Sequence, residues 1–132
     1  MFLDASAIVA MLTDEPEGAA FRQAVAEEPD PITSPVAVYE SALAIARRKG
    51  REPEAAHEIV VGFLASAEIR TVEIGDAEHR LAVQAFARFG KGRGHPAQLN
   101  MGDCFAYACA KVHSRSLLFK GDDFSRTDIQ PA

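Results

Sequence analysis

Short apolar segments that alternate with longer helical segments are the feature that most restricts the fold of this chain. The segments Phe2–Leu3, Ile32–Thr33 and Ser116–Phe119 have the composition of brief strands, and Ile69–Ile74 alternates apolar and polar residues as a strand does. Strands that alternate with helices are typical of an α/β sandwich built on a mainly parallel sheet. We therefore expect an α/β/α sandwich with a central, mainly parallel sheet, and a last short strand at Asp128–Ile129.

Capping residues and prolines predict where the helices begin and end. Ser34 supplies a capping hydroxyl, Pro35 fits the first turn after it, and Gly50 ends that helix. We expect Asp76 and Asn100 to cap two later helices. The expected helices are Ala5–Leu12, Pro16–Glu27, Pro35–Lys49, Pro53–Ala67, Asp76–Phe89 and a last one that runs from Asn100 to Lys111.

Length and composition are those of one ordinary globular unit. With 132 residues, 48% hydrophobic and 25% charged, the chain fits a single domain over residues 1–132. No apolar run approaches the roughly 20 residues of a membrane helix, and the first residues lack a basic leader. We expect no membrane association and a cytoplasmic location. The net charge of -5 argues against non-specific binding of nucleic acid by bulk charge.

Aspartates follow two of the expected strands. Asp4 comes directly after Phe2–Leu3, and Asp122 and Asp123 come after Ser116–Phe119. In parallel sheets, ligands bind at the carboxyl ends of the strands. Aspartate is also a common helix cap and turn residue, so each of these positions alone has a structural explanation as well.

Glu40 is a carboxylate within an apolar stripe of its expected helix. Val36, Leu43 and Ala44 are four residues before, three after and four after it, so they share its face. A glutamate in such a stripe is costly unless it is paired, binds a cation, or reaches water at the margin.

Asp103 lies at the start of a helix that otherwise suits a protein core. If Asn100 caps that helix, Asp103 is its third residue, where the helix dipole stabilises a negative charge. Ala106, Tyr107 and Ala110 follow on the same face. These small or flat side chains would leave room above the carboxylate.

Carboxylates from two strand ends and two helices would meet at one edge of such a sheet. Several carboxylates at close range repel, and their pKa values rise unless a cation intervenes. Mg²⁺ suits oxygen ligands of this kind, and Mn²⁺ prefers similar donors. No His/Cys spacing typical of zinc competes. The sequence predicts an acidic metal site suited to phosphate chemistry.

Four stretches in this order resemble the PIN-domain ribonucleases, and more narrowly the VapC-type toxins of bacterial toxin–antitoxin operons. They are FLDASAIVAML, VYESALA, NMGDCFAYACAK, and LLFKGDDF followed by TDI. The resemblance covers nearly the whole chain. It implies a PIN-like fold, RNA as substrate, and phosphodiester hydrolysis by metal-activated water. It also implies a homodimer that a cognate antitoxin protein neutralises.

The resemblance also assigns roles to individual residues. Asp4, Glu40 and Asp103 match the three central acids of the family. Asp122 is the expected fourth acid, with Asp123 as the alternative because the turn is spelled GDDF. Ser6 matches a hydroxyl that often lies near the metal.

Two basic clusters are candidates for contact with RNA phosphates. One ends the Pro35–Lys49 helix, where we single out Arg47 and Arg48. The other lies in the glycine-rich loop before Asp103, where we single out Lys91 and Arg93. The first cluster could equally be a solvated helix end with favourable dipole placement.

Two other functional classes compete with a nuclease. Aspartyl phosphatases and phospho-receiver domains also place an aspartate after a first strand. The phosphatase pattern has a second acid two residues later, where this chain has Ser6. The other class is a non-catalytic PIN-like module that only binds a partner.

Overall fold

The computed structural model describes residues 1–132 and contains one four-stranded sheet. The strand order is β3-β2-β1-β4, and every neighbouring pair is parallel. The strands are β1 (Phe2–Leu3), β2 (Ile32–Thr33), β3 (Arg70–Thr71) and β4 (Leu117–Leu118). The expected parallel sheet is confirmed.

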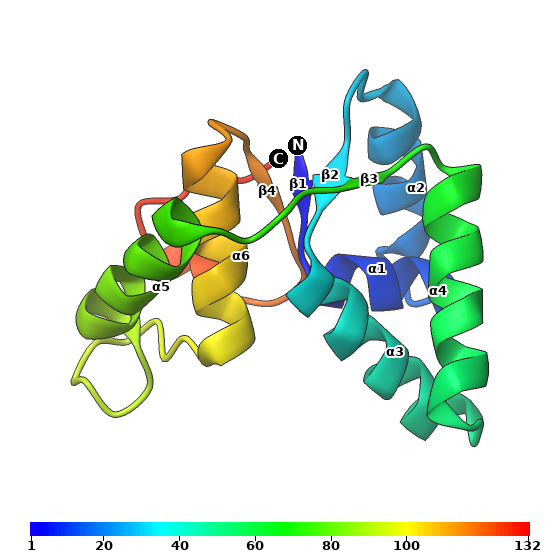
Figure 1. The fold of residues 1–132 in the computed structure, drawn as a ribbon, viewed down its shortest axis with the longest axis horizontal. Coiled ribbons are helices and arrows are strands. Elements are labelled where there is room, and N and C mark those ends of the chain that lie inside the picture. Colours follow the sequence, from blue (N-terminus) through cyan, green and yellow to red (C-terminus); the bar gives the residue numbers. More distant parts are fainter.

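Helices cover both faces of this sheet, so the predicted α/β/α sandwich is confirmed. In Figure 1, α5 and α6 lie on one side of the strands and α1 to α4 on the other. None of the helices combines the length and the apolar character needed to cross a membrane. The helices are α1 (Ala5–Leu12), α2 (Gly18–Glu27), α3 (Pro35–Lys49), α4 (Pro53–Ser66), α5 (Asp76–Phe89) and α6 (Met101–Val112), and a 3₁₀ turn spans Phe124–Arg126.

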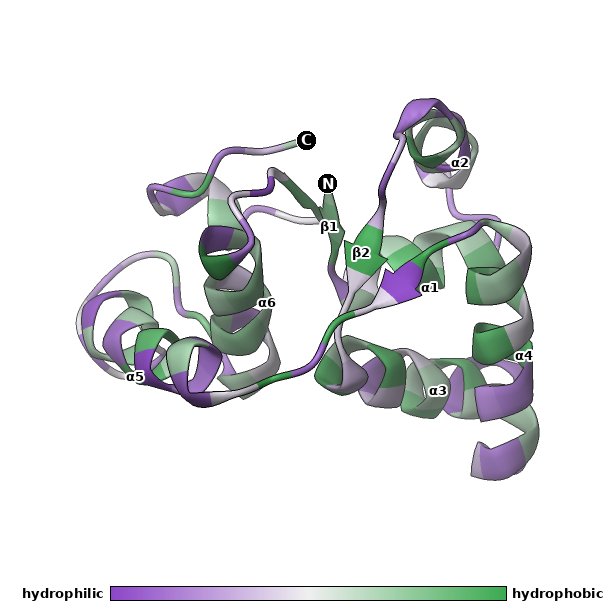
Figure 2. Cartoon of the chain, turned by 45° about the horizontal axis from the view of Figure 1, so that its top comes forward, coloured by the Kyte–Doolittle hydropathy of each residue, from purple (hydrophilic) through white to green (hydrophobic).

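Successive strand residues enter two separate cores, because side chains along a strand alternate between faces. Phe2 and Leu117 pack in the core beneath α5 and α6, whereas Leu3 and Leu118 pack in the core beneath α1, α3 and α4. Figure 2 shows hydrophobic residues on β1 and β2, and mixed hydrophobic and hydrophilic residues along α3 and α5. Burial on both faces explains why β1 and β4 consist of apolar residues only.

The strand register places Asp4 at the carboxyl edge of the sheet. Phe2 pairs with Ile32 on one side and with Leu117 on the other. The Asp4 N–H then donates to the Leu118 carbonyl at 3.0 Å. The chain segments that leave β1, β2 and β4 therefore begin at the same edge.

Two strand predictions were inaccurate. The third strand covers only Arg70–Thr71 rather than Ile69–Ile74, since it is an exposed edge strand with one neighbour. The predicted strand at Asp128–Ile129 is wrong. There the Tyr107 hydroxyl donates to the Asp128 carboxylate at 2.6 Å, and the chain bridges Leu117 only at Pro131.

Two helix starts also differ from the prediction. Helix α2 begins at Gly18 instead of Pro16, because the Gly18 N–H donates to the Glu15 carbonyl at 2.8 Å in a turn. Gly75, not Asp76, is the cap of α5, because the Glu78 carboxylate accepts the Gly75 N–H at 2.9 Å.

Candidate active site

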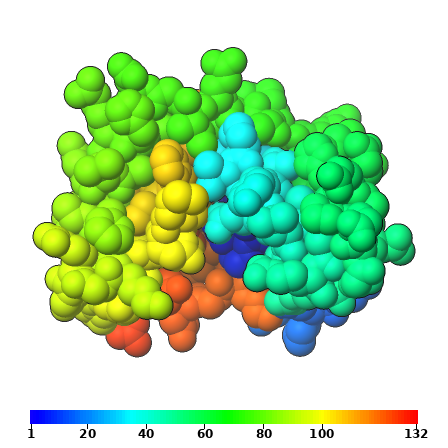
Figure 3. Space-filling model, turned by 60° about the horizontal axis from the view of Figure 1, so that its bottom comes forward, coloured from blue at the N-terminus to red at the C-terminus, as the bar shows by residue number.

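A groove of about 620 Å³ opens at the carboxyl edge of the sheet. Figure 3 shows it between α3 (cyan to teal) and α6 (yellow), with N-terminal residues in blue at its bottom and the segment after β4 in orange at its rim. Ser6, Glu40, Met101 and Gly121 are among the residues that line it. Four segments that are distant in sequence thus meet at one groove.

Asp4 caps α1 and is almost fully buried. Its side chain is about 5% exposed. The Asp4 Oδ2 accepts the Ser6 N–H at 2.9 Å and the Ser6 hydroxyl at 2.5 Å. Burial nevertheless raises the pKa of Asp4, because these hydrogen bonds do not replace the lost hydration.

Glu40 is half-buried on α3 and faces the N-terminal turn of α6. Burial, together with the charges of Asp4 and Asp103, raises the pKa of its carboxyl to about 7. A Cβ placed on Gly102 would overlap both Glu40 carboxylate oxygens. The carboxylate of Glu40 therefore rests directly on the bare backbone of Gly102.

Asp103 belongs to a capping box at the start of α6. Its Oδ2 accepts the Asn100 N–H at 2.9 Å, and its own N–H donates to the Asn100 side chain at 2.9 Å. The prediction that Asn100 caps this helix is confirmed. Burial raises the pKa of Asp103 to about 6, and the charges of Asp4 and Asp123 contribute.

The two aspartates after β4 differ in their relation to the other acids. Asp122 and Asp123 are both exposed. The charge of Asp123 raises the pKa of Asp103, whereas Asp122 is not among the groups that do so. The Asp122 carbonyl accepts the Ser125 N–H and hydroxyl in the 3₁₀ turn. Asp123 is therefore the better candidate for a fourth acid.

The carboxylates of Asp4, Glu40 and Asp103 are suitable ligands for a hard divalent cation, although their present positions do not form a metal-binding geometry. None of Asp4, Glu40 and Asp103 forms an ion pair with a basic side chain. No three Asp, Glu, His or Cys side chains are placed to hold one metal ion together. Uncompensated carboxylates repel, so ion binding would draw these side chains inward. Their oxygens are the ligands that Mg²⁺ and Mn²⁺ prefer.

The raised pKa values predict how stability depends on pH in the absence of divalent cations. Glu40 and Asp103 have ordinary values of 4.5 and 3.8 and folded values of about 7 and about 6. At a pH between the ordinary and the folded pKa values, the folded chain binds more protons than the unfolded chain. The contribution of these two groups to stability is therefore largest below their ordinary pKa values and is lost as pH rises through their folded pKa values. We expect a melting temperature several degrees lower at about pH 7.5 than at about pH 5.

The measurement is thermal unfolding in EDTA at both pH values. Mg²⁺ should recover more stability at the higher pH, since it binds the ionised carboxylates. Glu40→Gln and Asp103→Asn should each reduce the difference between the two pH values, which separates these two groups from the histidines. An equal pH dependence in the wild type and both variants would contradict the assignment.

The predicted phosphate-binding residues fall into two different places. Arg47 and Arg48 line the groove that contains Glu40, and Arg48 is paired with the Glu15 carboxylate. Lys91 and Arg93 are exposed on the loop before α6, and neither of them lines the groove.

The sequence did not point to three residues of the site, which are Glu15, Gly102 and Lys120. Lys120 donates its backbone N–H to the Ser6 hydroxyl at 2.9 Å, and its side chain is paired with Glu15. Gly102 provides the surface on which Glu40 rests. A glycine in the first turn of a helix is a usable signal, because it needs a local reason. Nothing in the spacing connects Glu15 to Lys120.

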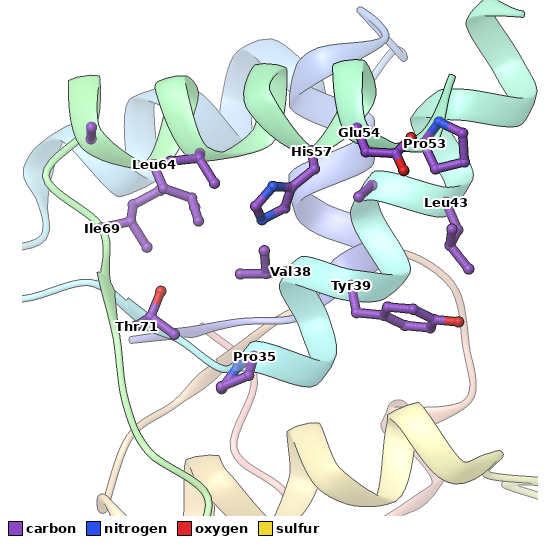
Figure 4. Close-up of a pocket in the computed structure, with 13 residues that line it drawn as sticks. Pro35, Val38, Tyr39, Leu43, Pro53, Glu54, His57, Leu64, Ile69 and Thr71 are labelled. Carbon is purple, nitrogen blue, oxygen red and sulfur yellow. The ribbon is translucent and has the colours of Figure 1, made fainter. Parts of the chain in front are cut away.

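A larger groove of about 700 Å³ lies between α3 and α4, away from the acids. Figure 4 shows its apolar lining, including Val38, Leu64 and Ile69, with the His57 ring projecting into it. None of the candidate acids lines this groove. Tyr39 and Leu43 line both grooves, so the two adjoin along α3.

Comparison with protein families matches residues 1–130 to the PIN domain. The chain belongs to the PIN-domain family. The VapC ribonuclease Mb2780c of Mycobacterium bovis is 39% identical to this PIN-domain chain over 132 residues, which is 100% of this chain and 98% of that protein. The ribonuclease VapC of Mycolicibacterium smegmatis is 43% identical over 129 residues, or 98% and 97% of the two chains.

A solved structure has the same fold as this PIN-domain chain. The crystal structure of Mycobacterium tuberculosis VapC20, described as a sarcin-ricin loop cleaving toxin, superimposes with a TM-score of 0.77. The match covers 99% of this chain and 97% of that one, at 16% identity. The suspected membership among the VapC ribonucleases is confirmed, and the phosphatase or receiver alternative is not favoured.

Proposed function

We propose that this chain is a metal-dependent endoribonuclease and the toxin component of a VapBC-type type II toxin–antitoxin system. The observation that carries the proposal is that three acids without a cationic partner lie at or beside one groove. Glu40 lines the groove and rests on Gly102, next to Asp103, and Asp4 is hydrogen-bonded to Ser6, which also lines it. The charges of Asp4 and Asp103 contribute to the raised pKa of Glu40, and the charge of Asp4 contributes to that of Asp103, which agrees with short separations between these groups. Relatives named VapC ribonucleases, 39% and 43% identical over nearly full length, support the same function.

Asp4 and Asp103 would hold Mg²⁺ directly, and Mn²⁺ would also suit them. Ser6 holds the Asp4 carboxylate, and Asn100 holds one oxygen of Asp103. Glu40 and a fourth acid, Asp122 or preferably Asp123, would orient and deprotonate the attacking water or hold a second ion. When bound, the metal would lower the pKa of that water and offset the charge on the phosphate. We expect products with a 5′-phosphate and a 3′-hydroxyl.

The RNA strand would approach over the basic end of α3. Arg47 and Arg48 line the groove with Glu40, so they are the preferred contacts for backbone phosphates. Lys91 and Arg93 form a second candidate contact, reached only by a strand that extends past the start of α6.

The cognate antitoxin would dock in the apolar groove between α3 and α4. Tyr39 is about 61% exposed there. Along α3 this apolar groove adjoins the groove lined by Ser6, Glu40 and Met101, which we call the acid groove. A peptide that followed it would cover the acids. Val83, Phe86 and Met101 form an exposed apolar patch that meets the groove containing Glu40 at Met101, and we propose this patch as the contact with a second copy in a homodimer. We also propose a cytoplasmic location.

The experiment that tests the function is the mapping of RNA 5′ ends in cells after induction of the chain. The wild type should generate new, defined ends, and Asp4→Asn should generate none. New ends common to both would show that this acid is not catalytic. The absence of new ends with the wild type would overturn the ribonuclease proposal.

A further inference from the structure

Three charged side chains from distant parts of the chain meet on one wall of the acid groove. Glu15 comes from the connection between α1 and α2, Arg48 from the end of α3, and Lys120 from the segment after β4. Arg48 Nη1 and Lys120 Nζ both donate to the Glu15 carboxylate. All three residues line the groove that also contains Glu40.

The burial of these side chains differs in a way that leaves the cations accessible. The side chain of Glu15 is only about 13% exposed, whereas those of Lys120 and Arg48 are about 36% and 52% exposed. The carboxylate thus lies beneath two cations that still face the groove. Hydrogen bonds from Lys120 and Arg48 lower the pKa of Glu15 to about 2, so it stays ionised.

Lys120 is also tied to the acids through its backbone. Its N–H donates to the Ser6 hydroxyl at 2.9 Å, and that hydroxyl donates to Asp4 Oδ2 at 2.5 Å. Two hydrogen bonds therefore connect the Lys120 backbone to the most buried acid of the site. This connection anchors the Lys120 backbone beside Asp4.

We propose that Arg48 and Lys120 form a binding subsite for a backbone phosphate of RNA next to the bond that is cleaved, and that Glu15 is a positioning residue that holds both cations. The inference rests on the proposed ribonuclease function. An ion pair on an open surface contributes little, but here the buried Glu15 carboxylate contacts two long, flexible side chains, and Glu17 lies 3.4 Å from Lys120 Nζ as a second partner. Each side chain keeps further N–H groups for a phosphate.

A competing role for Glu15, as a rival of phosphate for the two cations, predicts a different effect of Glu15→Gln on RNA binding. If Glu15 competed with phosphate for Arg48 and Lys120, Glu15→Gln would release two cations and strengthen RNA binding. If Glu15 positions them, Glu15→Gln weakens RNA binding although it makes the net charge less negative.

The test uses two measurements on the full chain. Binding of a short fluorescent RNA of mixed sequence is measured by anisotropy in EDTA across a salt series, and steady-state cleavage is measured with Mg²⁺ on an RNA that the wild type cuts. Lys120→Gln and Arg48→Gln should each raise Kd and KM about tenfold, with kcat within about threefold of the wild type. Each should lower the salt slope by about 0.7.

Three further variants make the result specific. Lys120→Arg should keep the wild-type KM, and Glu15→Gln should raise KM and Kd as the cation variants do. Arg70 is an exposed arginine on β3 that pairs with Asp30, and Arg70→Gln should change neither Kd nor KM. Unfolding curves establish that each variant is folded.

The outcomes separate this inference from the function on which it rests. A wild type that cleaves no RNA with Mg²⁺ or Mn²⁺ overturns the proposed function. A wild type that cleaves, with Lys120→Gln at an unchanged KM, overturns only the phosphate subsite. Tighter RNA binding by Glu15→Gln overturns the positioning role of Glu15.

Discussion

Replacement of Asp4 by asparagine is expected to reduce RNA cleavage by at least about a thousandfold without loss of the fold. Asparagine is as good a helix cap as aspartate, so α1 keeps its N-terminal hydrogen bond from Ser6. What the substitution removes is the negative charge next to Ser6, which lines the groove. A neutral amide is a much weaker ligand for a hard divalent cation than a carboxylate.

The same variant should be at least as stable as the wild type when divalent cations are absent. Burial raises the pKa of Asp4, so its ionised form destabilises the folded chain at neutral pH. Asp14→Asn is a matched control, because Asp14 is about 87% exposed and is paired with Arg22 rather than placed near the other acids. Cleavage rates are measured with a labelled RNA in Mg²⁺. A rate for Asp4→Asn within tenfold of the wild type would contradict a role for this acid in metal binding.

Gly102→Ala is expected to lower cleavage about a hundredfold, although the same type of change usually stabilises a helix by about 1 kcal/mol. The added Cβ would overlap both carboxylate oxygens of Glu40. The Glu40 carboxylate must then leave its place against Gly102, while the backbone of α6 can stay helical. The expected result is a folded protein with a displaced acid and a low kcat.

Gly62→Ala provides the control for this experiment. Gly62 lies within α4, and a Cβ added there would meet no atom within 4 Å. The control should gain up to about 1 kcal/mol of stability and cleave at the wild-type rate. If Gly102→Ala cleaves as fast as Gly62→Ala, then Glu40 either does not rest on Gly102 or does not contribute to the reaction.

The parallel sheet and the places of Asp4, Glu40 and Asp103 in the fold were predictable because each depends on local sequence. Phe2–Leu3 is apolar throughout since both of its faces are buried, and Asp4 follows it directly. Glu40 interrupts an apolar stripe, and Asn100 begins a recognisable capping box before Asp103. The short strand at Asp128–Ile129 was predicted wrongly because a buried isoleucine can belong to a loop as well as to a strand.

Other parts of the site depend on contacts that sequence spacing does not encode. The ion pair between Glu15 and Lys120 joins residues 105 positions apart. The choice between Asp122 and Asp123 depends on the path of one turn after β4, where Gly121 has a φ of 101°. The roles of the acids, the phosphate-binding arginines and the single domain over residues 1–132 stay predictions.

The most direct measurement of the central claim is anomalous diffraction from crystals of this chain grown with Mn²⁺. The ion should lie in the groove between α3 and α6, directly bound to Asp4 and Asp103, with Glu40 bound to it or to one of its waters. It should be absent from crystals of Asp103→Asn grown in the same way. Strong anomalous density only at other sites, or none in the groove of the wild type, would contradict the proposal that these acids converge to bind a catalytic metal.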